Sequence, residues 1–237
     1  MIRLRSAAII AACVMVLAAC AAPEIPFDHS SSQDVKTIGI VTPAFSPKPS
    51  VVLASSVGQS LGLIGAMVDA TMQSNRETDF KKLADSHGFA PEDVFDQALT
   101  ESLEKQGYTV KKVPVKHDKA AFLDHYPPVE DTQIDAYLDV VVIGYGYIAA
   151  GISSSNPYRP AVIVKAKLVR AKDTSVLMQD QIFYNPVNTP KKTITLSPDP
   201  KYTFVDFDAL MGDPDRAVEG MQVSLKESAR TVGTLLH

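Results

Sequence analysis

The stretch AYLDVVVIGYGYIA, residues 136–149, constrains the fold more than any other part of the chain. Val140–Ile143 is an unbroken apolar run, and most residues around it are apolar or aromatic. A strand with one face in water alternates apolar and polar residues, whereas a strand covered on both faces reads as a continuous apolar run. The stretch therefore predicts a long strand inside a sheet.

Further strands are predicted on both sides of this one. Residues 36–45 and 108–115 are short runs rich in β-branched residues. Residues 161–184 contain two such runs on either side of the turn sequence AKDTS, a spacing typical of a hairpin. Together with residues 136–149, these segments predict a sheet of four or five strands.

Helices are predicted before this sheet region and after it. Residues 91–107 begin with Pro91, which suits the first helical position, and end at Gly107. The last helix starts at Asp213, a good capping residue. The four predicted helices span residues 55–72, 77–88, 91–107 and the residues after Asp213. Residues 116–133 and 186–212 predict loops.

The resulting order of elements is β-α-α-α-β-β-β-β-α. It predicts an α/β (α+β) fold in which a mixed sheet of four or five strands carries helices mainly on one face. We expect a single domain over residues 36–237.

The 19 residues 50–68 carry no charge, which is unusual for a surface segment. Within them and just beyond, small residues recur at a spacing of four: Gly58, Gly62, Ala66 and Ala70. Such a stripe lets another backbone approach closely. One hypothesis is a contact helix that packs on a neighbouring subunit or lies on a membrane. The alternative is a helix buried under the sheet of its own domain.

The chain begins with a pattern typical of an export signal. Arg3 and Arg5 precede the apolar run of residues 7–19, which is too short to span a membrane as a helix. Leu17-Ala18-Ala19-Cys20 resembles the lipobox of bacterial lipoproteins. The resemblance implies cleavage between Ala19 and Cys20, a diacylglycerol on the Cys20 sulfur and a fatty acyl chain such as palmitate on its amine. The alternative is an ordinary secretory signal with a cysteine by chance.

Ala21 follows the cysteine, and the sorting rule of the same lipoproteins implies the periplasmic face of the outer membrane rather than the inner membrane. Residues 20–35 are mostly polar, contain two prolines and predict a lipidated tether. Fifteen flexible residues would reach about 20 Å on average and about 50 Å when stretched.

The composition argues against nucleic-acid binding and against an internal disulfide. Removing residues 1–19, which hold two Arg and no acid, changes 23 basic and 27 acidic residues to 21 and 27, a formal charge of −6. Without a run of basic residues, nucleic acid is not an expected partner. Cys13 leaves with the signal, so the mature chain keeps one cysteine and forms no internal disulfide. No cofactor is expected apart from the covalent lipid on Cys20.

Catalytic patterns are weak throughout the chain. GISSS at residues 151–155 lacks the second glycine of a nucleophile elbow, and no HExxH occurs. Four loop residues contain groups that can bind metal: His117, Asp118, Asp124 and His125. One interpretation is that they assemble into a metal site, and the other is that their side chains are simply solvated. We therefore predict no catalytic residues, no metal site and no enzymatic activity.

The loop at residues 151–160 joins two predicted strands. Tyr158 and Arg159 could carry recognition at its tip, because loops hold much of the functional chemistry of proteins. The alternative is a plain hairpin connection.

A helix ending in LEKQGYTV, the strand DAYLDVVVIGYGYI and the hairpin RPAVIVKAKLVRAKDTSVLMQDQIFY form a recurring order. This order resembles bacterial envelope lipoproteins whose domain is similar to the amino-terminal domain of the translocation protein TolB. The curli secretion lipoprotein (CsgG-like) and the ring lipoproteins of exopolysaccharide export share that architecture. The resemblance covers roughly residues 36–236.

The resemblance implies a non-enzymatic structural or accessory subunit of an envelope export or assembly complex, with other envelope proteins or further copies of itself as partners. The chain lacks an obvious pair of amphipathic transmembrane strands, so pore formation is not expected. The alternative function is a periplasmic lipoprotein that binds a lipid or small apolar ligand between helix 55–72 and the sheet.

Overall fold

The computed structural model describes residues 24–53, 62–128, 133–151, 156–185, 187, 189 and 193–237, and side chains within residues 62–71 lie outside this description. In chain order the strands are β1 (Thr37–Val41), β2 (Ala44–Phe45), β3 (Ser50–Leu53), β4 (Thr109–Val113), β5 (Ala136–Ala149), β6 (Arg159–Arg170), β7 (Val176–Tyr184) and β8 (Ile194–Leu196). The helices are α3 (Gly62–Ser86), α4 (Pro91–Lys105), α5 (Phe207–Gly212) and α6 (Pro214–Thr234), with a 3-10 turn, η2, at Pro200–Tyr202.

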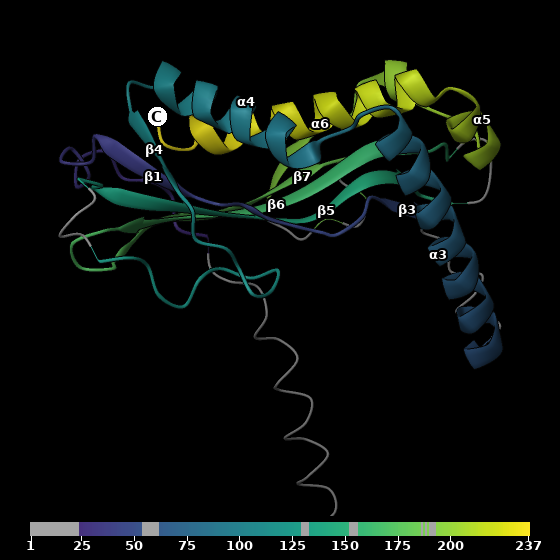
Figure 1. Cartoon of the computed structure of the whole chain (residues 1–237), viewed down its shortest axis with the longest axis horizontal. Coiled ribbons are helices and arrows are strands. Elements are labelled where there is room, and N and C mark those ends of the chain that lie inside the picture. Colours follow the sequence, from purple (N-terminus) through teal and green to yellow (C-terminus); the bar gives the residue numbers. More distant parts are fainter. Residues whose placement is uncertain are drawn as a thin grey trace, which may run out of the picture.

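The strands form one open mixed sheet in the order β4-β1-β5-β6-β7-β8, and β2 and β3 also pair with β5 (Figure 1). β1, β2 and β3 run parallel to β5 one after another, while β6 pairs with β5 in antiparallel orientation. The predicted fold class is confirmed, with β5 inside the sheet. β2 lies at the end of the single strand predicted over residues 36–45, and β3 and β8 were not predicted, because two to four residues give no readable periodicity.

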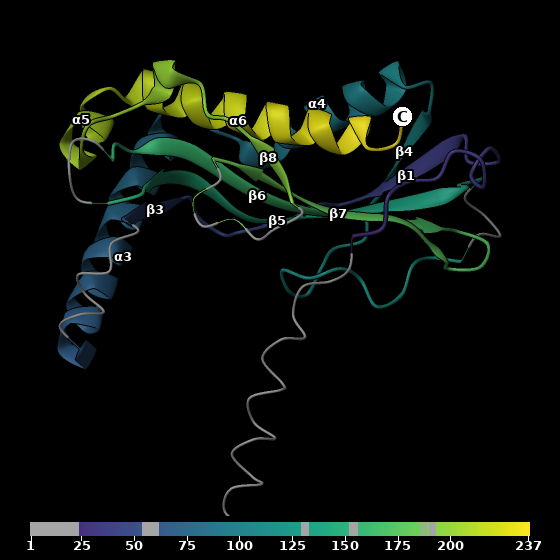
Figure 2. The same ribbon diagram turned by 180° about the vertical axis from the view of Figure 1, so that it is seen from behind.

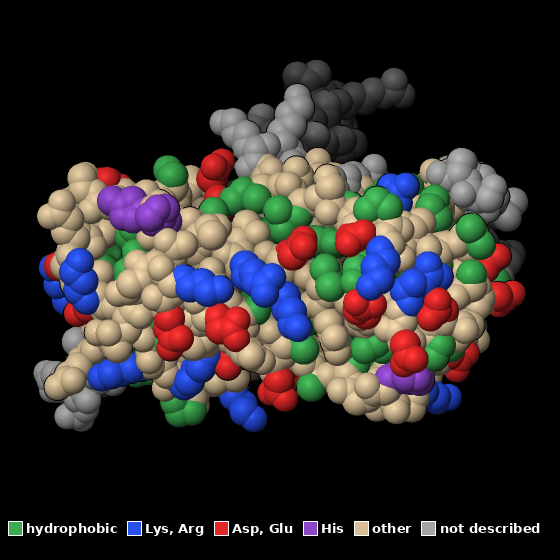
Figure 3. Space-filling view, turned by 90° about the horizontal axis from the view of Figure 1, so that it is seen from above, with side chains coloured by type: hydrophobic (Ala, Val, Ile, Leu, Met, Phe, Trp, Pro, Cys, Tyr) green, Lys and Arg blue, Asp and Glu red, His purple; other side chains and the backbone are tan. Residues whose placement is uncertain are grey.

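α4 and α6 lie side by side over one face of the sheet (Figures 1 and 2). α6 starts where the sequence predicted, with the Asp213 side chain accepting from the amide of Arg216. The two helices approach closely because Gly233 has no side chain, so that Ser102 fits against it and donates to the carbonyl of Arg230 at 3.0 Å. Their outer surface mixes acidic and basic side chains (Figure 3).

The opposite face of the sheet is covered by a loop and not by helices in the described part of the chain. Residues 114–128 cross it without regular structure, as predicted for that region. Beneath them lies a small second core of buried residues: Val41, Val113, Ile134, Tyr137 and Ala171. Ile143 of β5 is 37% exposed, so this face is not covered along its whole length.

Residues 24–35, predicted as part of a tether, instead pack on the sheet. Ile25 and Gln179 of β7 exchange two backbone hydrogen bonds of 2.8 Å. Arg170 at the end of β6 pairs with Asp34, and Val35 is buried in the main core. The polar composition concealed this attachment, because a backbone bridge and the ion pairs of Asp34 with Arg170 and Lys172 leave no periodic signal.

The uncharged segment is divided between two elements. Residues 50–53 form β3, and α3 begins at Gly62 and continues without a break to Ser86. The two helices predicted over 55–72 and 77–88 are therefore one helix where they are described, which ends before a positive φ of 66° at Gly88. Among the described residues, no helix is long and apolar enough to cross a membrane.

Gly146 explains how β3 reaches β5. It adopts a φ of 138°, and a Cβ atom there would collide with the backbone of Ser50. Gly146 thus admits a neighbouring strand, while Gly144 sits at a β-bulge with open space around it.

Candidate interaction surface

The carboxyl-terminal half of α3 is fixed to the body of the protein. The buried ring of Phe80 makes an edge-to-face contact with Tyr147 of β5 at a centroid distance of 5.6 Å. Glu77, also buried, forms an ion pair of 2.7 Å with Lys48 in the loop before β3. These contacts orient the helix rigidly from one end.

The amino-terminal half of α3 extends beyond the sheet, on the side opposite α4 and α6 (Figures 1 and 2). Residues 62–71 have the sequence GLIGAMVDAT, in which Asp69 is the single charge. Met72, where side chains are again described, is 49% exposed. A helix with two glycines in its first turn is poor by propensity, and most of the stability of helices in proteins comes from packing. We name residues 62–72 the α3 arm.

The α3 arm contains most of the predicted contact stripe. Gly62, Ala66 and Ala70 follow one another at a spacing of four along its helical backbone and therefore share a face. Gly58 lies outside the described residues. The predicted cleavage and lipidation residues, Ala19 and Cys20, also lie outside them.

The two predicted recognition residues, Tyr158 and Arg159, differ in how exposed they are. Tyr158 forms a backbone bridge with Phe204 and is only 4% exposed, so its ring is not offered to a partner. The prediction for Tyr158 failed because the chain turns into the sheet one residue before β6. Arg159 opens β6 and is exposed, and a recognition role for it stays a prediction.

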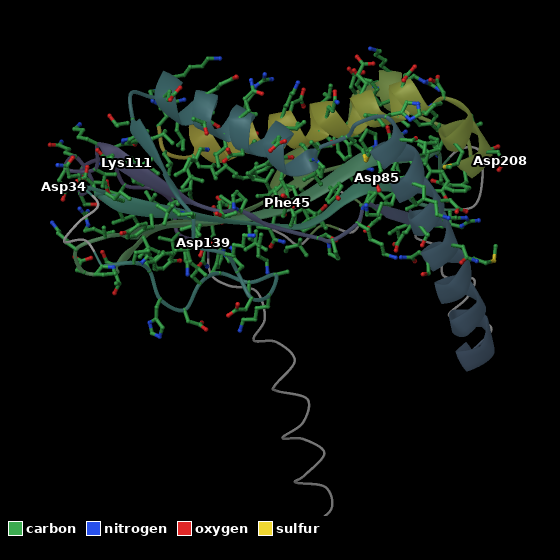
Figure 4. The ribbon with its side chains drawn as sticks, viewed as in Figure 1. Asp34, Phe45, Asp85, Lys111, Asp139 and Asp208 are labelled. Atoms are coloured by element: carbon green, nitrogen blue, oxygen red, sulfur yellow. The ribbon has the colours of Figure 1, made fainter. Side chains whose placement is uncertain are left out.

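A buried polar cluster fixes residues 114–128 to the sheet. Asp139 of β5 is fully buried (Figure 4), and its carboxylate accepts from His117 Nε2 at 2.7 Å. The same carboxylate accepts from the amide of Leu123 and from the hydroxyl of Tyr126, each at 2.8 Å. Three donors on one carboxylate compensate its desolvation. We name this the Asp139 cluster.

Cationic and aromatic groups complete the Asp139 cluster. Lys167 Nζ lies 4.7 Å from the ring centre of Phe122 and 5.4 Å from that of Tyr126. Burial lowers the pKa of Lys167, and the Asp139 carboxylate acts in the opposite direction. Burial, and then Asp139, raise the pKa of Tyr126.

The sequence missed the Asp139 cluster, although it singled out His117. The one available signal was a charged residue inside the apolar strand. The His117 side chain is only 3% exposed, and its Nδ1 atom has no hydrogen-bond partner among the described residues. The described part of the chain holds no group of three side chains suited to a metal ion. The cluster fastens a loop to the sheet.

No family model matches this sequence, and no curated protein matches it. Among solved structures, it is similar to protein XCC0632 of Xanthomonas campestris, of family DUF330, with 10% identity over 83% of this chain and 81% of that chain and a TM-score of 0.41. Lipoprotein GNA1162 of Neisseria meningitidis gives 16% identity over 62% and 81%, with a TM-score of 0.28. A neuraminyllactose-binding hemagglutinin homologue of Helicobacter pylori gives 10% identity over 88% and 89%, with a TM-score of 0.26.

Proposed function

We propose that this protein is a lipid-anchored, non-enzymatic accessory subunit of a cell-envelope export or assembly complex. It is held through Cys20 at the periplasmic face of the outer membrane and works by protein contacts. The observation that carries this proposal is the α3 arm, an apolar helical segment held out from the sheet by a well-packed base. The lipobox-like sequence before Cys20 supports the anchor.

The resemblance to TolB-like and curli-secretion lipoproteins supports the same function, because those proteins act as parts of envelope machines. In this proposal the partner that binds the α3 arm is another envelope protein or a second copy of this chain. Small residues at the contact allow a close backbone approach, which a longer side chain would prevent.

Native mass spectrometry of the mature lipoprotein, extracted in mild detergent, tests the proposal. We expect a defined homo-oligomer or a complex with a co-extracted envelope protein. Gly62→Leu should dissociate that complex while leaving the melting temperature of the domain unchanged. Gly212→Leu is the matched control, since a Cβ at Gly212 meets nothing within 4 Å. A monomer in the wild-type extract would contradict the proposal.

The anchor has its own test. We expect Cys20→Ala to abolish labelling by a fatty acid and to release the protein from the membrane fraction. Continued membrane association of the variant would show that another segment holds the protein there.

The alternative, a carrier of small apolar ligands, receives less support. A cavity of about 530 Å³ lies between the amino-terminal segment, the α4–β4 turn and the end of α6, which is not the predicted position beside helix 55–72. Polar side chains make up much of its lining, including His29, Gln33, Lys36 and Gln106. Acyl ligands recovered from the folded, delipidated protein would revive this alternative.

A further inference from the structure

A small cavity of about 50 Å³ lies where β5 ends, β6 begins and β7 ends. Arg159 lines it from the start of β6, and Asn185 and Val187 line it from the chain after β7. None of the described residues that line it is acidic. A water molecule needs about 10–15 Å³ of such space, so the cavity has room for a group of about three heavy atoms. We name it the Asn185 pocket.

The side-chain amide of Asn185 is a hydrogen-bond donor that the fold leaves unused. Asn185 is only 8% exposed, and its Nδ2 atom is buried without a hydrogen-bond partner among the described residues. Its backbone, by contrast, is fully used: the amide N–H donates to the carbonyl of Leu196, and the carbonyl accepts from the amide of Val187, both at 2.9 Å. A buried donor without a partner costs free energy, which a ligand that accepts from it would recover.

The backbone of Asn185 adopts a conformation that side-chain-bearing residues rarely adopt. Its φ of 65° lies in the left-handed region, which asparagine tolerates better than most residues. Conformations of this kind persist where the surrounding structure imposes them, and they cluster at ligand-binding positions. The hydrogen bond to Leu196 of β8 helps to hold Asn185 in this conformation beside the cavity.

Arg159 supplies a positive charge to the same cavity. It is exposed, and its guanidinium forms no hydrogen bond or ion pair with any other residue that the structure describes. The remaining lining is mostly apolar and includes Ile148, Ala150, Pro157 and Val187. Apolar walls strengthen the attraction between the guanidinium and an anion, because they exclude water from around the charges.

We propose that the Asn185 pocket binds a carboxylate group. The Arg159 guanidinium and the Asn185 amide donate to its two oxygens, and the rest of the ligand lies outside the cavity. A planar guanidinium matches a carboxylate in shape. Its single charge balances one carboxylate, whereas a phosphate monoester carries nearly two charges. This inference is independent of the α3 arm, and its failure would leave the proposed function untouched.

The test is titration of the mature lipoprotein with sodium acetate at pH 7 in mild detergent, followed by NMR. The side-chain amide of Asn185 and the backbone amide of Ala150 report occupation of the pocket. We expect both signals to shift and saturate with a dissociation constant of about 10 mM, within the affinity that four heavy atoms supply. Acetamide, the neutral isostere, should bind at least about 10-fold more weakly.

Two substitutions test the two donors separately, with the signal of Ala150 as the readout. Arg159→Gln should weaken acetate binding at least about 10-fold, whereas Arg230→Gln, at an exposed position of α6, is the matched control and should have no effect. Asn185→Gly keeps the positive φ but removes the amide, and it should weaken binding about 5- to 10-fold. The melting temperature should not fall in either variant, because neither side chain has a partner to lose.

Three outcomes would overturn the proposal. These are equal binding of acetamide and acetate, unchanged acetate binding by Arg159→Gln or Asn185→Gly, and tighter binding of inorganic phosphate than of acetate. The last result would show that the pocket selects a tetrahedral anion.

The carboxylate could belong to a free small acid or to an acidic side chain of a protein. N-acetylaspartate N-methylamide carries the same carboxylate on a blocked peptide unit. Binding at least as tight as that of acetate would assign the pocket to an acidic side chain. Much weaker binding, caused by collision of the peptide unit with the rim of the cavity, would assign it to a free acid.

Discussion

The two faces of the sheet are covered by different means. On one face, α4 and α6 bury an extensive apolar core that includes Leu225 and Phe95. On the other face, residues 114–128 are held by the Asp139 cluster above a second, much smaller core cluster. Apolar packing is spread over many contacts, whereas three of the hydrogen bonds that hold the second cover meet on one carboxylate. The first face should therefore set global stability, and the second should open locally.

The largest effect is expected on the helix-covered face. Leu225→Ala removes a fully buried side chain from the middle of α6 and should cost about 3 kcal/mol of unfolding free energy. Urea titration followed by circular dichroism measures it, with the exposed Glu227→Ala as control. A loss below about 1 kcal/mol would mean that this face does not dominate stability.

A smaller and more local effect is expected on the other face. Asp139→Asn keeps the shape of the side chain but removes the charge that three donors share, which should cost about 2 kcal/mol. Amide hydrogen exchange should accelerate in residues 116–126 and stay unchanged in α6. Asp118→Asn, at an exposed position of the same loop, is the control. Equal acceleration in α6 would erase the contrast between the faces.

The smallest effect concerns the amino-terminal segment at the edge of the sheet. Hydrogen bonds from Arg170, and then from Lys172, lower the pKa of Asp34 to about 2. Because this pKa is lowered on folding, the attachment is complete above the ordinary carboxyl pKa of about 4 and is lost as the pH falls through about 2.

The amide chemical shifts of Ile25 and Gln179, measured by NMR, should report that loss between pH 4 and pH 2. Asp34→Asn should remove the transition from this range. A transition that persists in the variant would assign it to another carboxylate.

The sequence was informative wherever structure is local. The strand at 136–149, the hairpin after it and the helices after Pro91 and Asp213 all carry periodicity and capping signals within a few residues. The position of Asp213 as a cap could be read directly from its neighbours, because the hydrogen bond runs to a residue three places on.

The sequence did not predict the contacts between segments that are distant along the chain. β3 pairs with the far end of β5 because Gly146 admits the backbone of Ser50, and neither stretch indicates the other. His117 and Asp139 lie 22 residues apart and meet only after the loop has folded back.

The attachment of residues 24–35 changes how far this protein can search for partners. For the proposed lipid on Cys20, only four residue steps separate the anchor from Glu24, which corresponds to a reach of about 14 Å rather than the 50 Å of a free tether. The volume that the domain explores shrinks with the cube of that reach, by roughly forty-fold. In the proposed complex, its effective concentration toward other proteins at the same membrane surface would rise by a similar factor, and a weak contact through the α3 arm would then be enough for the proposed assembly.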